Sequence, residues 1–329
     1  MSKFFTLVSI ENIKLWKRLS TKVMLIIMIV IMLLATSILK FYNVSKNISN
    51  TTKISENWKQ ELQQVVELEK TQLKQVESGS DVMGKATIGS IKRSIAEGEY
   101  RINNNIKPES QESIWTRVTS FYLNGFGGIV ALLLMISCSA LIAGEFSEGT
   151  MKMMISRPYK RFELLTAKLI ATFLYGLVLL ATTFLVLLLM MGIFFSFYGI
   201  GAKEMMWTGS SIMYIPAALK TIIVFGLDFL QVIVYVIITF AISVISRSRS
   251  IATGFSLFLL FVGSTIVQLL SMYFSWGKYL PLGMTNFTEF VTKGATISGT
   301  TLGMALGLSA LYSIIFCFAG YLVFEKRDI

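Results

Sequence analysis

The sequence predicts an all-α polytopic membrane protein with six transmembrane helices. Hydrophobic residues make up 54% of the 329 positions and charged residues only 15%, and the mean hydropathy is +0.66. A single water-soluble core of this size cannot bury so much apolar surface. Six apolar stretches explain the excess, because each can cross a hydrocarbon core of roughly 30 Å at about 1.5 Å per residue. They cover residues 23–39, 121–143, 169–197, 221–245, 251–274 and 301–324.

The composition also limits the chemistry that the chain can carry out. It contains no histidine, which removes the imidazole base, the usual catalytic triads and most catalytic zinc sites. Cys138 and Cys317 both fall inside apolar stretches, so we expect neither a disulfide framework nor a thiolate metal cluster. An intramembrane protease or transferase would need paired acids with histidine, or a metal signature. We therefore expect a non-catalytic membrane subunit that binds no metal and no cofactor itself.

The distribution of lysine and arginine orients the spans. Fourteen of these residues lie before the first span, between spans two and three, between spans four and five, and after span six, whereas the opposite short connections hold four. The positive-inside rule then places both termini in the cytoplasm, with the chain in the plasma membrane. The net charge of +11 suits anionic lipid at that face, so the lipid bilayer is the expected partner and nucleic acid is not.

Two segments outside the spans are expected to be helical. Residues 1–22 read as a helix along the cytoplasmic interface, because Phe4, Phe5 and Trp16 gather on one side; a topology signal alone is the alternative. Residues 40–118 are expected to form an extracytoplasmic helical insertion, with an amphipathic helix over 56–77 and a weaker one to about 97. This insertion would be a lid, a substrate-contacting domain, or only a spacer. Residues 119–329 would hold spans two to six.

The most informative segment is the connection at residues 144–168, which follows the second span. It begins Gly-Glu-Phe-Ser-Glu-Gly-Thr at residues 144–150 and continues through Arg157 and Pro158 to Lys168. The Gly-Thr pair is expected to end the outgoing helix, and Pro158 restricts what precedes it. Acidic and basic side chains alternate where two spans leave the bilayer, so a short rigid helix there would offer charges to a soluble partner.

With this motif in this position, the chain resembles the permease subunits of ABC-2 type transporters. In that family an acidic residue, then Glu-Gly-Thr, a proline, a basic residue and a later lysine connect the second and third spans. The resemblance implies a coupling helix that sits in a cleft of an ATP-binding subunit. The alternative is a solvated turn whose basic residues only fix topology. The residues that the resemblance assigns to ATPase coupling are Glu145, Glu148, Gly149, Thr150, Arg157, Pro158, Arg161 and Lys168.

The energy source would have to lie on another polypeptide. No Gly-x-x-x-x-Gly-Lys-Ser/Thr phosphate loop occurs in the sequence. The resemblance implies ATP and Mg on a separate ABC ATPase subunit, and a second permease copy or paralogue. The expected function is export of an amphipathic or hydrophobic cargo, such as a peptide, an antibiotic or a lipid-like molecule. An ATP-independent channel or secondary transporter is the alternative, and it should show more buried charges or broken helices.

Polar residues and glycines inside the spans are the remaining candidates. Asp228 costs roughly 2.5 to 3.5 kcal/mol at such depth, so we expect it and Gln231 to face protein or water. They are pathway candidates, or Asp228 makes an interhelical hydrogen bond. Gly299, Gly303 and Gly307 recur every four residues, which favours close helix packing within the subunit or, alternatively, in a dimer. Residues 273–300 are too interrupted to span, and the resemblance implies short re-entrant helices there.

Overall fold

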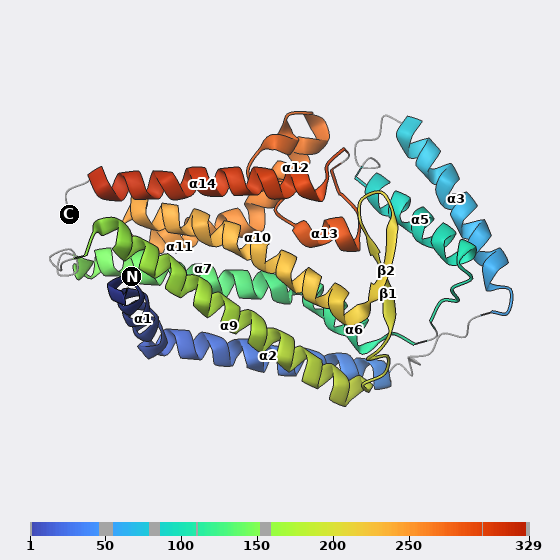
Figure 1. Ribbon diagram of the computed structural model, residues 1–329, viewed down its shortest axis with the longest axis horizontal. Coiled ribbons are helices and arrows are strands. Elements are labelled where there is room, and N and C mark those ends of the chain that lie inside the picture. The colour runs from blue at the N-terminus through green and yellow to red at the C-terminus, as the bar shows by residue number, and fades with distance from the viewer. Residues whose placement is uncertain are drawn as a thin grey trace.

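Six long apolar helices form the body of the protein. The computed structural model describes residues 2–45, 55–78, 86–109, 111–151, 159–297 and 299–326. Within these ranges six helical segments are long and apolar enough to cross a membrane, which confirms the polytopic helical architecture (Figure 1). In chain order they are α2 (Leu19–Ser45), α6 to α7 (Ile114–Ser147), α9 (Arg161–Phe195), α10 (Ala217–Ser246), α11 to α12 (Arg249–Tyr273) and α14 (Leu302–Lys326).

The helices extend beyond the apolar runs that predict them. Span three was expected to start near residue 169, but α9 begins at Arg161. Hydropathy marks only the part of a helix that suits hydrocarbon, whereas the hydrogen-bonded helix continues into its polar ends. The connection expected over 144–168 is correspondingly shorter, because Glu145 belongs to α7 and Lys168 to α9.

Two of the long segments contain a turn of π-helix. The first, η1 (Tyr122–Phe126), joins α6 (Ile114–Phe121) to α7 (Gly127–Ser147), and the second, η2 (Leu259–Gly263), joins α11 (Arg249–Phe258) to α12 (Ser264–Tyr273). Inside η1, Gly125 has a φ of 146°, a conformation that only glycine adopts without strain. Such π-turns frequently mark functional positions in helices.

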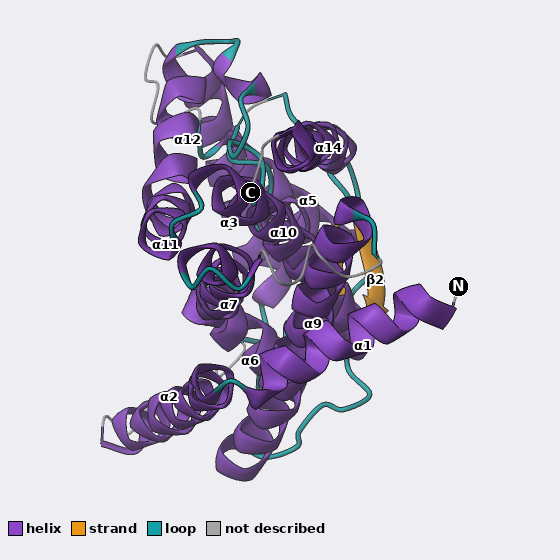
Figure 2. Ribbon diagram, turned by 90° about the vertical axis from the view of Figure 1, so that its left-hand side faces the viewer, coloured by secondary structure: helices purple, strands orange, loops and turns teal. Residues whose placement is uncertain are grey.

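α10 lies at the centre of the bundle. It packs against α7, α14 and α11, and its buried side chains belong to the two apolar clusters of the protein (Figure 2). By contrast, α2, α12 and α14 keep large apolar side chains exposed, among them Ile26 at 58% and Ile314 at 67%. Exposed apolar helix faces of this extent suit hydrocarbon rather than water.

At one end of the bundle, α1 (Ser2–Lys17) crosses the other helices steeply and packs against α9 (Figures 1 and 2). Leu7, Val8 and Leu15 are buried, and the ring of Trp16 meets that of Tyr175 edge to face at 5.5 Å. Phe5, on the other side, is 68% exposed. The apolar face of this helix is therefore divided between protein contacts and an outward surface.

The segment between α2 and α6 folds into a pair of helices at the opposite end of the bundle (Figure 1). These are α3 (Trp58–Ser78) and α5 (Ile88–Asn103), which pack against each other. Ion pairs between Lys70 and Glu99 and between Lys92 and Glu77, both at 2.9 Å, join them. Gly98 allows close approach, since a Cβ there would lie 2.4 Å from a methyl group of Val66.

A β-hairpin follows α9, which departs from the all-α expectation. β1 (Lys203–Trp207) pairs antiparallel with β2 (Ile212–Pro216), with Lys203 opposite Pro216. The local sequence gave no clear strand signal because neither strand alternates apolar and polar residues. Tertiary contacts hold the hairpin instead: the Glu204 carboxylate accepts hydrogen bonds from Ser113, Thr116 and Lys220.

The connection between α12 and α14 contains short helical pieces. η3 (Gly277–Tyr279) is a single 3₁₀ turn, and α13 (Phe287–Thr292) packs against α10 and α14. Phe287 is 1% exposed, so α13 contributes to the core rather than lying on the surface. The interruption expected over residues 273–300 is present in this form.

The glycine strip near the sixth long helix has no close neighbour among the described residues. Gly299 precedes α14 and has a φ of 76°, whereas Gly303 and Gly307 lie in its first turns. A Cβ built at any of the three would meet no other described atom within 4 Å. Packing within the subunit, the commoner use of such a strip, is therefore not seen among the described residues.

We expect Gly98→Leu to separate α3 from α5, because a larger side chain would clash with Val66, which is 4% exposed. The measurement is limited trypsin digestion of the detergent-solubilised protein, with cleavage at Lys70 and Lys74 rising several-fold. The matched control is Gly226→Leu, at a helical glycine where a Cβ meets nothing within 4 Å. Equal cleavage of the two variants would contradict the packing described.

Candidate functional site

Four charged side chains meet where α1, α7 and α9 come together. They are Glu11 and Lys14 of α1, Glu145 near the end of α7, and Lys168 in the second turn of α9; we call them the charge cluster. The Lys168 Nζ atom lies 2.7 Å from one Glu11 oxygen and 2.6 Å from one Glu145 oxygen. Lys14 Nζ lies 2.7 Å from the other Glu11 oxygen and 3.7 Å from the other Glu145 oxygen.

The charge cluster is enclosed by protein. Lys168 and Glu11 are 0% exposed and Glu145 is 5% exposed. Removing such charges from water is costly, and only close opposite charges offset the cost. Burial by itself raises the pKa of Glu11, but Lys168 and Lys14 outweigh it and hold that pKa below its ordinary value. α1, the end of α7 and the start of α9 are therefore fixed relative to one another by charges that are costly to separate.

This placement corrects the sequence expectation for two residues. Glu145 and Lys168 were expected in a surface connection, with their charges offered to a soluble partner. Both are instead buried against α1, because the helices extend further than their apolar runs. Sequence reasoning missed Glu11 and Lys14 as their partners. One signal was available, since Glu11 is the only acidic residue among the first 55.

The Glu-Gly-Thr turn follows Glu145 of the charge cluster and is largely exposed. Glu148 and Gly149 are exposed, and Gly149 has a φ of 71°, which suits a glycine that ends a helix. The Thr150 hydroxyl lies 3.3 Å from the Glu145 carbonyl oxygen, to which it donates a hydrogen bond. The turn is thus tied to the last turn of α7.

The other residues of the motif are divided between α9 and a part of the chain without a structural description. Arg161 is the first residue of α9, and the Lys160 backbone N–H just before it donates to the Glu163 carboxylate at 3.1 Å. Arg157 and Pro158 lie outside the described residues.

Phe146 connects the motif to two further helices. The Arg247 guanidinium, directly after α10, lies 5.5 Å from the centre of the Phe146 ring. The Phe324 ring of α14 meets the same ring edge to face at 6.0 Å. Together with the charge cluster, these contacts place the end of α7 in touch with α1, α9, α14 and the connection after α10.

Asp228 lies inside the bundle, away from the charge cluster. It is 7% exposed, and it accepts a hydrogen bond from the Tyr122 hydroxyl of η1. A Cβ at Gly127 would lie 2.8 Å from one Asp228 oxygen, so the glycine leaves room for the carboxylate. The interhelical hydrogen bond weighed from the sequence is present. The side-chain oxygen of Gln231 is buried without a hydrogen-bond partner among the described residues.

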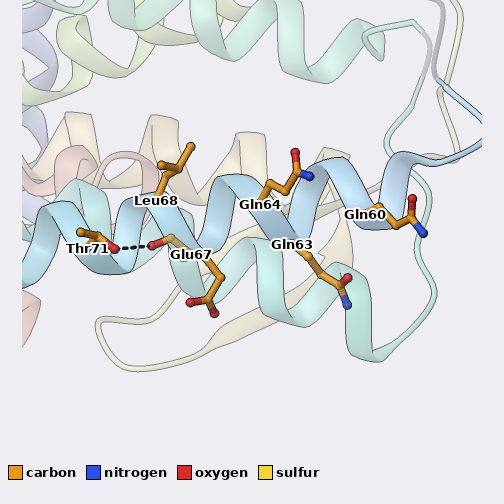
Figure 3. A pocket seen from close by; sticks show the side chains of 6 residues that line it. All are labelled: Gln60, Gln63, Gln64, Glu67, Leu68 and Thr71. Atoms are coloured by element: carbon orange, nitrogen blue, oxygen red, sulfur yellow. Dashed lines mark hydrogen bonds between the residues drawn. The ribbon is translucent and has the colours of Figure 1, made fainter.

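Within the described residues, neither the acidic and cysteine side chains nor the hollow along α3 forms a metal or small-molecule site. No group of three or more acidic or cysteine side chains is arranged there to hold a metal ion. A wide hollow of about 670 Å³ runs along α3 (Figure 3). Side chains of one helix line it, and Figure 3 shows Leu68 and Gln64 pointing away from Glu67 and Gln63. It lacks the converging groups of a binding site.

Comparison with known proteins assigns the family. A family model described as "Protein of unknown function (DUF2705)" matches residues 84–329. The chain belongs to this DUF2705 family. All the described residues of α6 to α14, including the Glu-Gly-Thr turn, Lys168 and Asp228, fall in the part that matches the family model, whereas α1 and α2 precede it.

Two relatives come from Bacillus subtilis (strain 168). The uncharacterized protein YhcI is 30% identical over 276 residues, which cover 83% of this chain and 85% of YhcI. The uncharacterized membrane protein YdbK is 25% identical over 203 residues, covering 61% of this chain and 78% of YdbK. The description of YdbK as a membrane protein agrees with the six apolar helices of this DUF2705 chain.

We expect Lys168→Met to destabilise the protein by about 3 to 5 kcal/mol, because it leaves the Glu11 and Glu145 carboxylates buried without their shared cation. Thermal unfolding in detergent micelles measures the loss. Lys168→Arg keeps the charge and should lie between this variant and wild type. Lys17→Met, on the exposed side of α1, is the matched control. Equal stability of the two methionine variants would show that the charge cluster is dispensable.

We expect Asp228→Leu to cost about 1 to 3 kcal/mol, because it leaves the buried Tyr122 hydroxyl without its acceptor. Asp228→Asn keeps an acceptor oxygen and should unfold close to the wild-type temperature. Adding Tyr122→Phe to Asp228→Leu should restore much of the loss, since both polar groups are then gone. A Leu variant as stable as the Asn variant would mean that the hydrogen bond contributes nothing.

Proposed function

We propose that this chain is the permease subunit of an ABC exporter, powered by a separate ATPase subunit. The observation that carries the proposal is the set of buried ion pairs next to the Glu-Gly-Thr turn. Its exposed residues Glu148 and Gly149 follow the buried Glu145, which is paired with Lys168 and Lys14. A turn that only fixes topology needs basic residues near the membrane, but it does not need buried ion pairs beside it.

The charge cluster would transmit force from the turn to the helices. A push on the turn reaches α7 directly, α9 through Lys168, and α1 through Glu11 and Lys14. Phe146 extends the contact to α14 and to the connection after α10. Closely packed, ion-paired helices move as a unit, so a small displacement at the turn would become a rearrangement of the bundle. ATP and Mg would be bound by the partner, and this chain would contribute the moving helices.

The proposed orientation places the turn in the cytoplasm. The ends of α7, α10 and α14 and the start of α9 lie at the end of the bundle where both termini are found (Figure 1). Eleven of the fourteen lysines and arginines counted from the sequence lie in described residues, at or near this end. The positive-inside rule then supports cytoplasmic termini in the plasma membrane, with α3, α5 and the hairpin outside.

The proposed assembly includes a second permease copy or paralogue, as the resemblance to ABC-2 permeases implies. The cargo would be amphipathic or hydrophobic, such as a peptide, an antibiotic or a lipid-like molecule. A channel or secondary transporter that needs no ATPase is the second candidate, and the buried Asp228 favours it. A single buried acid with a tyrosine partner is also explained by helix packing, so we prefer the exporter.

We expect Glu148→Lys and Arg161→Glu each to lower ATPase coupling about tenfold, because charge reversal at a docking contact costs on the order of 1.4 kcal/mol or more. The full tagged chain is purified from gently solubilised native membranes. The measurements are the amount of nucleotide-binding subunit that copurifies and the vanadate-sensitive ATP hydrolysis of the eluate.

The matched control is Glu61→Lys, an exposed charge reversal on α3 at the far end of the molecule. It should leave both measurements unchanged. Absence of a nucleotide-binding subunit from the wild-type eluate would count against the exporter and favour the channel or secondary transporter. Wild-type hydrolysis by both reversal variants would rule out the Glu-Gly-Thr turn as the docking contact.

A further inference from the structure

Two cavities adjoin at the end of the molecule that carries the hairpin. One, of about 230 Å³, is lined by α2, α6, η1 and α9, and we call it the apolar-walled cavity. The other, of about 340 Å³, is lined by α5, the segment before α6, the hairpin and the start of α10, and we call it the charged cavity. Glu112 lines both, so the two meet just before α6. Neither includes a residue of the charge cluster.

The apolar-walled cavity has an apolar side and an ion-paired rim. Leu39, Phe121, Met191 and Phe195 supply its apolar wall. At the rim, the Arg117 guanidinium donates to the Phe195 carbonyl oxygen at 2.8 Å and lies 5.4 Å from the centre of the same ring. The Arg117 Nε atom also lies 3.7 Å from a Glu112 carboxylate oxygen, so the cavity has a fixed ion pair beside an apolar interior. It borders η1, the π-turn that contains Gly125.

The charged cavity has paired and unpaired charges. Glu97 is paired with Arg93 at 3.4 Å and with Arg101 at 3.0 Å. Glu204 is paired with Lys220 at 2.9 Å and also accepts two hydroxyl hydrogen bonds. These groups therefore satisfy one another and form a rigid frame for the cavity.

Two lysines that line the charged cavity form no ion pair among the described residues. Lys107 and Lys203 have no carboxylate within 4.0 Å among the described residues, although both line the cavity. Lys203 lies over the ring of Tyr214 at 5.9 Å. Burial, and then the nearby Glu204 charge, raise the pKa of Glu109, so this wall loses negative charge more easily. Five basic and four acidic side chains line the cavity, so the surplus is one positive charge.

From this pairing of cavities we propose that the hairpin end binds an anionic amphiphile, with a phosphate or carboxylate head at Lys107 and Lys203 and its apolar tail in the apolar-walled cavity. Lysine supplies a point charge that suits such anions, and the apolar wall gains by covering a tail. This binding site adds to the proposed function. Only the statement that the ligand is the cargo rests on the exporter proposal. Binding itself requires no ATPase.

The test uses the purified full chain in phosphatidylcholine nanodiscs, with dodecyl phosphate as the probe and isothermal titration calorimetry as the measurement. Saturable binding is expected, at least tenfold tighter than that of dodecyl maltoside or of inorganic phosphate. The Lys107→Gln, Lys203→Gln double variant should lose at least tenfold in affinity. Lys59→Gln with Lys74→Gln removes the same charge from α3 and should bind as wild type does.

A second variant tests the tail. Leu39→Trp fills the apolar-walled cavity, so it should weaken dodecyl phosphate at least tenfold relative to wild type, while butyl phosphate should bind both proteins alike. The melting temperature of each variant checks that the fold is intact. The proposal is overturned if the double lysine variant binds dodecyl phosphate as tightly as wild type, or if the maltoside and the phosphate probe bind equally.

The source of the ligand is distinguished by changing the nanodisc. If phosphatidylglycerol in the disc displaces dodecyl phosphate, the site takes a bilayer lipid head group; if it does not, the site takes a free amphiphile. Either result supports the site. Because these measurements contain no ATPase, they can succeed where ATPase coupling fails, and a failure of binding leaves the coupling experiment unaffected.

Discussion

Burying one lysine between two glutamates constrains the rest of this structure. Lys168, Glu11 and Glu145 come from three different helices, and all are nearly inaccessible. If any one of these helices moved away, it would leave an uncompensated charge in a poorly solvating environment, at a cost of several kcal/mol. α1, the end of α7 and the start of α9 must therefore stay together. The rest of that end of the bundle, including the contacts of Phe146, is arranged around this requirement.

The two ends of the molecule are built on different principles. At the charge-cluster end, charges are matched and enclosed, which suits a part that carries force without deforming. At the hairpin end, Glu204 fixes the frame by hydrogen bonds from α6 and an ion pair with α10, and cavities remain beside it. A π-turn at η1 and the buried pair of Tyr122 and Asp228 lie along the segment that connects the two ends. The proposed exporter would use this division, with energy entering at the charge-cluster end and cargo leaving at the hairpin end.

Helix packing explains why the polar groups of the interior need not all be functional. Asp228 is accommodated because Gly127 leaves room for it and Tyr122 donates to it. Such an arrangement stabilises contact between η1 and α10 whether or not cargo passes nearby. By contrast, the glycine strip at 303 and 307 is not explained by packing, since no described atom of the subunit lies close to it. A polar residue in a span and a small-residue strip therefore have to be interpreted from their neighbours.

The sequence by itself determined the six long apolar helices, since the cost of moving each residue into hydrocarbon is local and nearly additive along a helix. It also indicated one helix over 56–77 and a weaker one to about 97, which the structure places at 58–78 and 88–103, and it singled out the Glu-Gly-Thr turn. Only the tertiary structure decided the partners: Glu11 meets Lys168 across 157 positions, and Tyr122 meets Asp228 across 106. It also decided the hairpin, whose short strands depend on Glu204. Pairings of this kind rest on geometry between distant segments, for which neither periodicity nor composition carries a signal.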